Sequence, residues 1–465
     1  MPMRALRERV IDLRDPEQDL ARGRAQRKIT PRRELAQLTP STRSATEILV
    51  AQNARRVPEL VPLRFARMLA DPFSFYRGSA AVMAADLAAG RSSGIEVLCC
   101  GDAHLANFGI YAAPDRALVF DLNDFDEAAI APAEWDLKRL VTSVVIGGRH
   151  ARYPSKAIRQ TAERTVRAYR TGLDTMLDMT VLGRYYLRME PERYRNQMDA
   201  GVAAVLNRTL KRARKQTSSR VFARIMTLGP DGTPRLLENP PVLEHVDIDA
   251  ETELVESLSE YIGGVPVDVA MVLSHFRVTD IARRVVGVGS VGTRCYLAIL
   301  TGPAGEPLIL QAKEASRSVL DEFGHAPQPG ILREAIATYG QGVRVMDGQR
   351  ILQGSSDVFL GTMRYDGRDF YVRQFHDMKG TVELQGMPAK TFGEYAIACA
   401  VALARAHAQS ANLSMLRGYL GNNDTVVRAI VEWCYAYAAK SLDDFHQLRA
   451  AAKAGDIDVA DEPAR

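Results

Sequence analysis

Apolar residues recur at two different spacings along this chain, and each spacing predicts a different kind of element. Over residues 45–87 and again over much of 155–276, apolar positions return every three or four residues, which predicts helices. Between these regions, two short runs of apolar and β-branched residues at 95–100 and 117–120 predict buried strands. We therefore expect the first part of the chain to be mainly helical, with a short stretch of strands inside it.

The second half of the chain begins with a different pattern. Residues 285–314 and 352–376 alternate β-branched and aromatic residues with turns, which predicts a small antiparallel sheet. A helix at about 330–348 separates these strands, and helical spacing returns at 391–409 and 424–452. A small β unit within a mostly helical chain predicts an α+β fold.

At 465 residues the chain is too long for one ordinary core, so two lobes are expected. The predicted regions are a basic, weakly ordered arm (1–45), a first part of the large lobe (46–155), a helical section of that lobe (156–276), a small β lobe (277–380), and returning large-lobe helices with a tail (381–465).

Composition narrows the class of protein. The five cysteines have no paired spacing, which favours a reduced, cytoplasmic protein. No apolar stretch approaches the roughly 20 residues that span a bilayer, and the N-terminus lacks the apolar segment of a secretory signal. The net charge of +4 equals the excess of basic over acidic residues in 1–34, so a nucleic-acid partner is not expected.

Polar side chains gather directly after the two predicted strands of the first half. They are Asp102, His104 and Asn107 after the first strand, and Asp121, Asn123, Asp124 and Asp126 after the second. Loops on a rigid scaffold commonly carry chemistry, and carboxylate and amide oxygens suit Mg²⁺. Turn-forming residues that only cap the strands are the structural alternative. Seven polar residues exceed what capping needs, so we predict a metal-binding catalytic centre.

A glycine-rich segment, with Gly287, Gly289, Ser290 and Gly292, matches the G-x-G-x-x-G pattern. In a dinucleotide-binding fold this loop opens a helix. Here residues 293–300 predict a strand instead, and a β-hairpin of this kind covers phosphates in protein kinases. Glycine allows the backbone to approach phosphates closely. An ordinary glycine-rich hairpin is the structural alternative.

Lys313 ends an apolar strand, where a lysine is costly unless it has a partner. The phosphates of a nucleotide would provide one. A glutamate on the following helix is its usual companion, and we predict Glu334 in this position. Glu314 should point to the opposite face of the strand, so it is the weaker candidate.

These segments resemble the kinase-like fold, especially its aminoglycoside and choline phosphotransferase branch. Residues 101–107 resemble the catalytic loop H-G-D-x-H-x-x-N, with Cys100 in place of the first histidine, and 123–127 resemble the metal-binding I-D-F-D/E segment. The catalytic half precedes the glycine loop, and a helix at 402–408, like the one that normally leads into the catalytic loop, lies near the C-terminus. The order implies a circular permutation.

The chain from about 31 to 450 also resembles an uncharacterised bacterial family, domain-of-unknown-function family 2252. The matching segments are 75–78, 100–109, 123–127, 289–294, 313–315, 371–374 and 403–407. The substrate of that family is not settled.

The kinase-like resemblance implies ATP- and Mg²⁺-dependent phosphoryl transfer to an unidentified small-molecule or protein acceptor. Asp102 would be the catalytic base, Asn107 and Asp124 would hold Mg²⁺, and Asp126 would support the metal. His104 would brace the loop, and Asp121 is a weaker metal candidate. Arg77 has even odds of a site role, while Arg373 and Lys379 have no assigned role.

Three other functions stay open. A kinase-like fold can transfer AMP instead of phosphate. A metal-dependent phosphoesterase would explain the Gly-Asp-x-His segment but not Lys313 or the glycine loop. A nucleotide-binding scaffold without catalysis is the third alternative.

Overall fold

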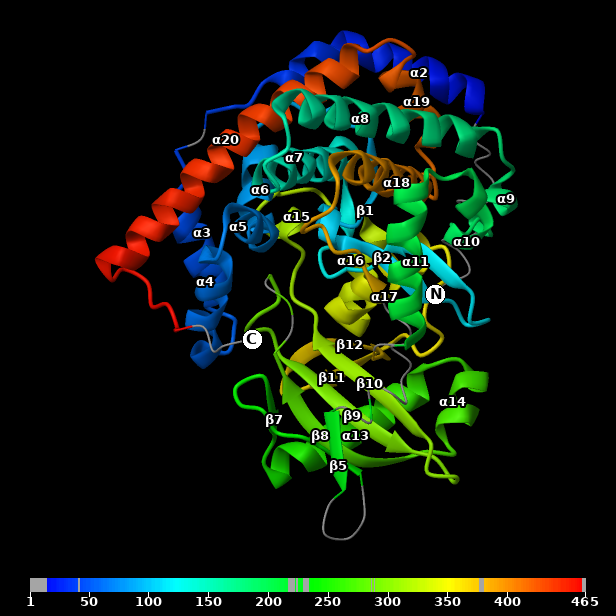
Figure 1. The fold of residues 1–465 in the computed structure, drawn as a ribbon. Coiled ribbons are helices and arrows are strands. Elements are labelled where there is room, and N and C mark those ends of the chain that lie inside the picture. Colours follow the sequence, from blue (N-terminus) through cyan, green and yellow to red (C-terminus); the bar gives the residue numbers. More distant parts are fainter. Residues whose placement is uncertain are drawn as a thin grey trace.

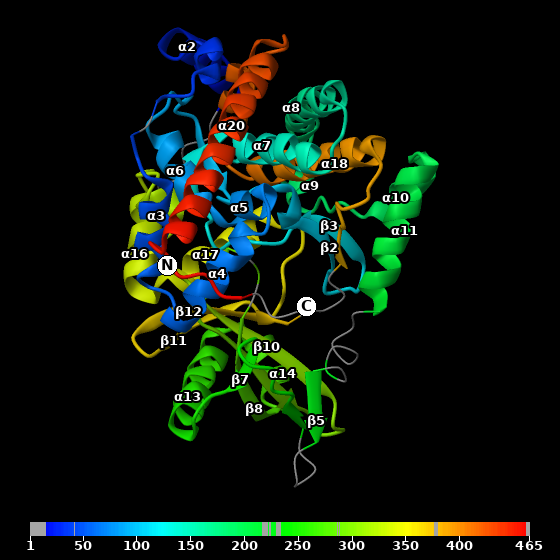
Figure 2. The same cartoon turned by 60° about the vertical axis from the view of Figure 1, so that its left-hand side comes forward.

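The computed structural model describes residues 15–461, except 41, 216–221, 223–224, 229–233, 286, 288 and 376–379. Figures 1 and 2 show a small lobe built on a sheet and, above it, a larger lobe of helices. Segments from both ends of the chain lie together in the large lobe, and the small lobe comes from the middle of the sequence. The fold is α+β, as predicted.

The small lobe contains a six-stranded antiparallel sheet with strand order β11-β12-β10-β9-β8-β7. Its strands are β7 (Leu243–His245), β8 (Arg277–Arg284), β9 (Cys295–Thr301), β10 (Pro307–Glu314), β11 (Gly361–Tyr365) and β12 (Arg368–Gln374). The predicted antiparallel sheet is confirmed.

Alternate residues of β10 enter two different cores, as the strand period of two requires. Leu308 and Leu310 pack with α13 (Ile248–Gly264) and α14 (Val267–Leu273), whereas Ile309 packs on the other face. Lys313 is four residues after Ile309 on the same strand, so its side chain points to this second face as well. Residues 243–273, which the sequence analysis placed in the large lobe, therefore cover the small sheet instead.

The single helix predicted at 330–348 is two helices, α16 (Gly330–Tyr339) and α17 (Gln341–Leu352). Gly340 separates them with φ of 80°, and a Cβ at this position would overlap the Asp369 carboxylate. Only glycine takes this backbone conformation readily, so the helix ends there.

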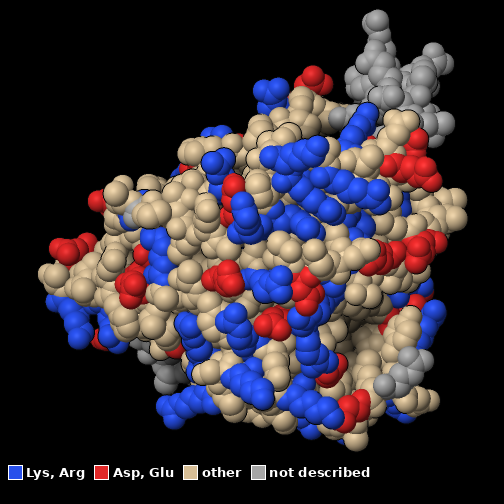
Figure 3. All heavy atoms as spheres, turned by 90° about the horizontal axis from the view of Figure 1, so that it is seen from above, with Lys and Arg blue, Asp and Glu red and all other residues tan. Residues whose placement is uncertain are grey.

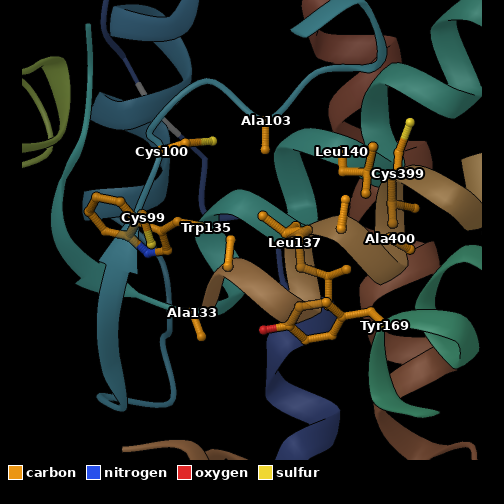
Figure 4. Close-up of a cluster of buried hydrophobic side chains, with 14 of the residues drawn as sticks. Cys99, Cys100, Ala103, Ala133, Trp135, Leu137, Leu140, Tyr169, Cys399 and Ala400 are labelled. Carbon is orange, nitrogen blue, oxygen red and sulfur yellow. The ribbon is translucent and has the colours of Figure 1, made fainter. Parts of the chain in front are cut away.

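The large lobe is organised around α7 (Glu134–His150), which is buried along nearly its whole length. It packs with α8 (Ser155–Leu177), α18 (Ala389–His407) and α20 (Thr425–Ala454). Figure 4 shows this core, to which Cys99 at the end of a strand and Cys100 and Ala103 in the following loop belong, together with Leu140 and Tyr169. The loop that carries the candidate residues therefore rests directly on the core.

The two strands predicted in the first half are confirmed, but they belong to different ladders. β1 (Glu96–Cys99) pairs with β4 (Ala129–Pro132), while β3 (Leu118–Leu122) pairs with β2 (Phe108–Ala112), which also pairs with β13 (Gly380–Thr381). The polar residues after β1 and after β3 still meet, because the chain returns from β3 to β4 beside β1.

Part of the predicted weakly ordered arm is a helix. α2 (Pro16–Ile29) packs on α19 (Leu413–Leu420), and Arg27 and Arg32 donate to the carbonyls at the C-terminus of α19. Residues 15–40 thus differ from the prediction because their arginines cap a neighbouring helix, and residues 1–14 lie outside the described part. Figure 3 shows many Lys and Arg side chains on this end of the molecule.

The other described elements lie around these two cores. They are η1 (Arg32–Ala36), α3 (Ala45–Asn53), η2 (Pro58–Leu60), α4 (Val61–Leu69), α5 (Pro72–Gly78), α6 (Ala80–Ala88), η3 (Leu105–Asn107), α9 (Val181–Tyr185), α10 (Pro191–Tyr194), η4 (Arg195–Gln197), α11 (Ala200–Lys215), β5 (Met226–Leu228), β6 (Pro234–Leu236) and α15 (Val319–Glu322). Among the described helices, none has the length and apolar character needed to cross a membrane.

Candidate functional site

The loop after β1, residues 100–107 and here called the Asp102 loop, is fixed by the first turn of α7. The backbone N–H groups of Cys100 and Gly101 donate to the Asp136 carboxylate at 2.7 and 3.0 Å. Asp136 also lies 3.2 Å from His407 Nε2 at the end of α18. The Cys99 thiol completes a cluster with these two side chains. Because amide donors already occupy the carboxylate, this cluster serves to position the loop.

Close packing brings the Asp102 loop against the segment after β3. Gly101 has φ of 83°, and a Cβ there would lie 2.2 Å from the Glu127 backbone oxygen. The Asn123 N–H donates to the Asn107 carbonyl at 2.9 Å. The two polar segments that the sequence analysis singled out are therefore in direct contact.

Asp102 is held by an arginine that the sequence analysis missed. Arg139 Nε donates to Asp102 Oδ1 at 2.8 Å, and the Arg139 guanidinium lies 3.9 Å from the centroid of the Tyr76 ring. Burial raises the pKa of Asp102 above its ordinary value, although Arg139 and Arg77 oppose this change. Asp102 is thus an oriented carboxylate with an increased proton affinity.

His104 is buried beneath the loop, and its Nε2 lies 3.6 Å from Asp102 Oδ2. Burial and the nearby Arg139 hold the pKa of His104 well below its ordinary value. Its Nδ1 has no hydrogen-bond partner among the described residues. A neutral, enclosed imidazole matches the predicted bracing role better than that of a general base.

Asn107 and Asp124 present oxygens that could bind a metal ion. Asn107 Nδ2 donates to the Asp102 carbonyl at 2.8 Å, which turns its Oδ1 away from that contact. Asp124 forms no ion pair with a Lys or Arg of the described residues, and burial together with Asp126 raises its pKa. A half-buried carboxylate without an ion-pair partner is costly, so a divalent cation would complete this pair.

Asp126, in contrast, already has partners. It forms an ion pair with Lys313 and accepts a hydrogen bond from the Tyr371 hydroxyl at 2.8 Å. Lys313 Nζ also donates to Ser290 Oγ at 2.9 Å. Burial would raise the pKa of Asp126, but Lys313 outweighs it and holds this pKa below the ordinary value. Asp126 therefore connects the metal-binding segment to the small lobe.

Two residues that were predicted for the site, Glu334 and Asp121, lie outside it. Glu334 is exposed on α16, and Asp126 forms the ion pair with Lys313 that was predicted for Glu334. Asp121 is buried and accepts from the N–H groups of Leu122 and Gly354, so it supports a turn. Glu314 points to the opposite face of β10, as predicted, and pairs there with arginines.

The hairpin loop at 287–292, here called the glycine loop and described except for residue 288, takes the left-handed conformation at two of its glycines. Gly287 and Gly292 have φ of 70° and 86°. Large-lobe residues hold the loop by its carbonyls: Arg67 donates to Gly287, Arg56 to Val291, and the Val57 N–H to Gly292. Nothing in the glycine pattern indicated these contacts, because their partners lie more than 200 residues away in sequence.

Two cavities meet at Asp124. The Lys313 cavity, about 470 Å³, is lined by residues that include Asn123, Asp124, Gly287, Ser290, Lys313 and Arg373. The Asp102 cavity, about 140 Å³, is lined by residues that include Arg56, Arg77, Asp102, His104, Asn107, Asp124, Asp126, Gly287, Gly289 and Ser290. Of the described residues predicted for the site, all line one of these cavities except Glu334, Gly292 and the weaker candidate Asp121. Lys379 lies outside the described residues.

The sequence offered a weak signal for Arg139. It follows Lys138 and lies between the apolar residues Leu137 and Leu140, and charged residues in such a place are buried only with partners. Arg77, which had even odds of a site role, lines the Asp102 cavity.

A family model described as "Uncharacterized protein conserved in bacteria (DUF2252)" matches residues 56–451. Neither a curated protein nor a solved structure matches the chain.

Proposed function

The chain belongs to the DUF2252 family of proteins conserved in bacteria, and we propose that it is an ATP- and Mg²⁺-dependent phosphotransferase with a circularly permuted, kinase-like fold. One observation carries this proposal. Asp102, Asn107, Asp124, Lys313 and the glycine loop, which come from distant parts of the sequence, converge on two cavities that share Asp124.

The Lys313 cavity is suited to a nucleotide. Lys313 and Arg373 supply two cations for the triphosphate, and Ser290 and Gly287 line the same cavity beneath the glycine loop. Lys313 is held in place by Asp126 and Ser290, so its ammonium group is positioned before a nucleotide binds. Positioning and charge neutralisation supply most of the catalysis of phosphoryl transfer.

Asn107 and Asp124 fit a hard divalent cation, because both offer oxygen donors and the Asp124 carboxylate lacks a cationic partner. Mg²⁺ held by these two residues would neutralise the negative charge of the nucleotide phosphates. Asp126 is occupied by Lys313 and Tyr371, so it supports the metal site indirectly.

Asp102 would receive the proton of the acceptor hydroxyl. The acceptor oxygen bonds to the γ-phosphorus, the bond to the β–γ bridging oxygen breaks, and its electron pair leaves with ADP. The raised pKa of Asp102 favours proton uptake, and Arg139 keeps its carboxylate oriented.

Contacts at the end of α18 support the permutation. Asn412 Nδ2 donates to the Glu96 carbonyl at 2.7 Å, and the Leu98 N–H donates to Ser410 Oγ at 2.9 Å. The chain after α18 therefore touches β1, the strand that leads into the Asp102 loop. A direct connection at this point would restore the order helix, strand, catalytic loop.

The alternative activities would require different residues or give different products. A phosphoesterase with several histidine ligands finds little support, because His104 is the only histidine among the described residues that line the two cavities. Transfer of AMP would use the same nucleotide cavity, and mass analysis of the product distinguishes a gain of phosphate from a gain of AMP.

Calorimetric titration of ATP with Mg²⁺ tests the proposal in the wild type, Lys313→Ala, Asp124→Ala and the control Glu334→Ala. We expect both site variants to weaken binding at least tenfold, or about 1.4 kcal/mol. The exposed Glu334 should have no effect. Equal affinity in all four proteins, or no binding to the wild type, would contradict the proposed nucleotide site.

A further inference from the structure

The Asp102 cavity contains two arginines that form no ion pair with a described carboxylate. Arg77 forms no ion pair or side-chain hydrogen bond with a described residue, and its Nε is buried without a partner. Arg56 is 9% exposed; it donates to the Val291 carbonyl, and its Nε is likewise buried and unpartnered. Arg56 is buried and Arg77 is half-buried, and an unpaired guanidinium in such a place is costly, so an anion is expected to complete the two groups.

Most other charges around this cavity are paired. The other two arginines are neutralised, since Arg55 pairs with Glu322 and Arg317 binds Asp321 with two hydrogen bonds. The carboxylates of Asp102, Asp126 and Glu314 pair with Arg139, with Lys313, and with Arg294 and Arg368. Glu127 accepts the N–H of Val319, and Asp124 is the carboxylate assigned to the metal. Glu127 and Asp124 form no ion pair with a described Lys or Arg, and Arg56 and Arg77 are the cations lining this cavity that likewise form none.

These arginines are separate from the cations assigned to the nucleotide. Lys313 and Arg373 line the Lys313 cavity, whereas Arg56 and Arg77 line the Asp102 cavity, and neither pair lines both. Because cations line both cavities, which share Asp124, two anionic groups are expected. The nucleotide supplies the first.

We propose that the acceptor is an alcohol that carries a phosphate group, bound by Arg77 and Arg56 while its hydroxyl faces Asp102. This inference rests on the proposed phosphotransferase function and adds the substrate class. A guanidinium matches phosphate oxygens with two parallel hydrogen bonds, and two such groups match a dianion better than a monoanion. The aminoglycoside and choline acceptors of the branch that the chain resembles are cations, so this cavity would select the opposite charge.

Inorganic phosphate is the probe for a direct test. It is titrated by calorimetry into the full chain saturated with Mg²⁺ and the β,γ-imido analogue of ATP, which fills the γ-phosphate position. We expect a dissociation constant of about 1 mM, at least tenfold weaker binding in Arg77→Gln, and intermediate binding in Arg77→Lys. Arg317→Gln, which removes a paired arginine from the same cavity, should change the affinity less than twofold.

The outcomes separate the two proposals. If the wild type binds the analogue but not phosphate at about 100 mM, the acceptor assignment is wrong. It is also wrong if Arg77→Gln weakens binding of the analogue instead, because Arg77 would then belong to the nucleotide site. Acetate binding as tight as phosphate binding would exclude the phosphate class. If the analogue does not bind while phosphate binds through Arg77, the nucleotide proposal fails and the anion site stands.

Arg77→Gln should fold like the wild type, because it removes no hydrogen bond or ion pair with a described side chain. Its thermal midpoint should equal that of the wild type. A variant that retains this midpoint and full phosphate affinity would overturn the proposal.

Discussion

The Asp102 loop and the glycine loop border the same cleft, but the protein holds them in different ways. The Asp102 loop rests on the buried helix α7, and Asp136 and the Ser143 hydroxyl accept its backbone N–H groups. The glycine loop lies between two strands of the small lobe and is held through its carbonyls by Arg56, Arg67 and Val57. The position of the first loop therefore depends on the fold itself, whereas the second can loosen without unfolding.

A pair of glycine substitutions would test this difference most strongly. Gly101 and Gly292 have nearly equal φ values, 83° and 86°, so alanine brings a similar backbone strain at each position. A Cβ at Gly101 would lie 2.2 Å from the Glu127 backbone oxygen, while one at Gly292 would meet the Arg56 side chain at 3.0 Å. We expect Gly101→Ala to lower the free energy of unfolding by about 4 kcal/mol and Gly292→Ala by about 1–2 kcal/mol.

Urea denaturation followed by circular dichroism measures both changes, and each variant is the control for the other. Equal losses would mean that the two loops are equally coupled to the fold, which contradicts the comparison.

A smaller change in the free energy of unfolding is expected when Lys138 is replaced. This lysine is buried in α7, with its Nζ 4.4 Å from the centroid of the Trp433 ring. Burial lowers the pKa of Lys138 from 10.5 to about 8, although Glu134 opposes this. Between these two pH values the unfolded chain binds more protons, so this residue makes the wild type more stable as the pH rises from 8 to 10.5.

Lys138→Met removes this pH-dependent contribution to stability. We expect the variant to exceed the wild type in stability by about 2 kcal/mol at pH 7, after the loss of the cation–π contact, and this advantage to disappear towards pH 10.5. Denaturation at a series of pH values measures the difference, with the exposed Lys390→Met as the control. If the difference in stability between the variant and the wild type stayed constant across this range, Lys138 in α7 beneath the Asp102 loop would be more hydrated than its burial indicates.

The sequence predicted the secondary-structure elements of the site better than the side-chain pairs that join them. The strands before Asp102 and Asp124, the antiparallel sheet and the opposite directions of Lys313 and Glu314 follow from local periodicity, and the structure confirms them. The Lys313–Asp126 pair joins residues 187 positions apart, and no local pattern distinguishes Asp126 from Glu334 as the partner. Arg139 was missed for a related reason, because its partner lies 37 residues earlier in another loop.

The smallest effect on stability, and the most selective one on binding, is expected at Arg67. Its side chain donates one hydrogen bond of 2.7 Å to the Gly287 carbonyl near the surface. Because a single exposed hydrogen bond contributes little, Arg67→Met should lower the free energy of unfolding by less than about 1 kcal/mol. Loosening the glycine loop should nevertheless weaken ATP binding about three- to tenfold, since the loop must then be ordered when the nucleotide binds.

Arg170→Met is a matched control for Arg67→Met. Arg170 also donates one hydrogen bond to a loop carbonyl, that of Asn423 at 2.8 Å, but it lies away from both cavities. Calorimetric titration of ATP with Mg²⁺ should separate the two variants, while their unfolding free energies stay close. If Arg67→Met instead loses stability without any loss of affinity, the contact belongs to the fold, and the glycine loop would be as firmly built in as the Asp102 loop.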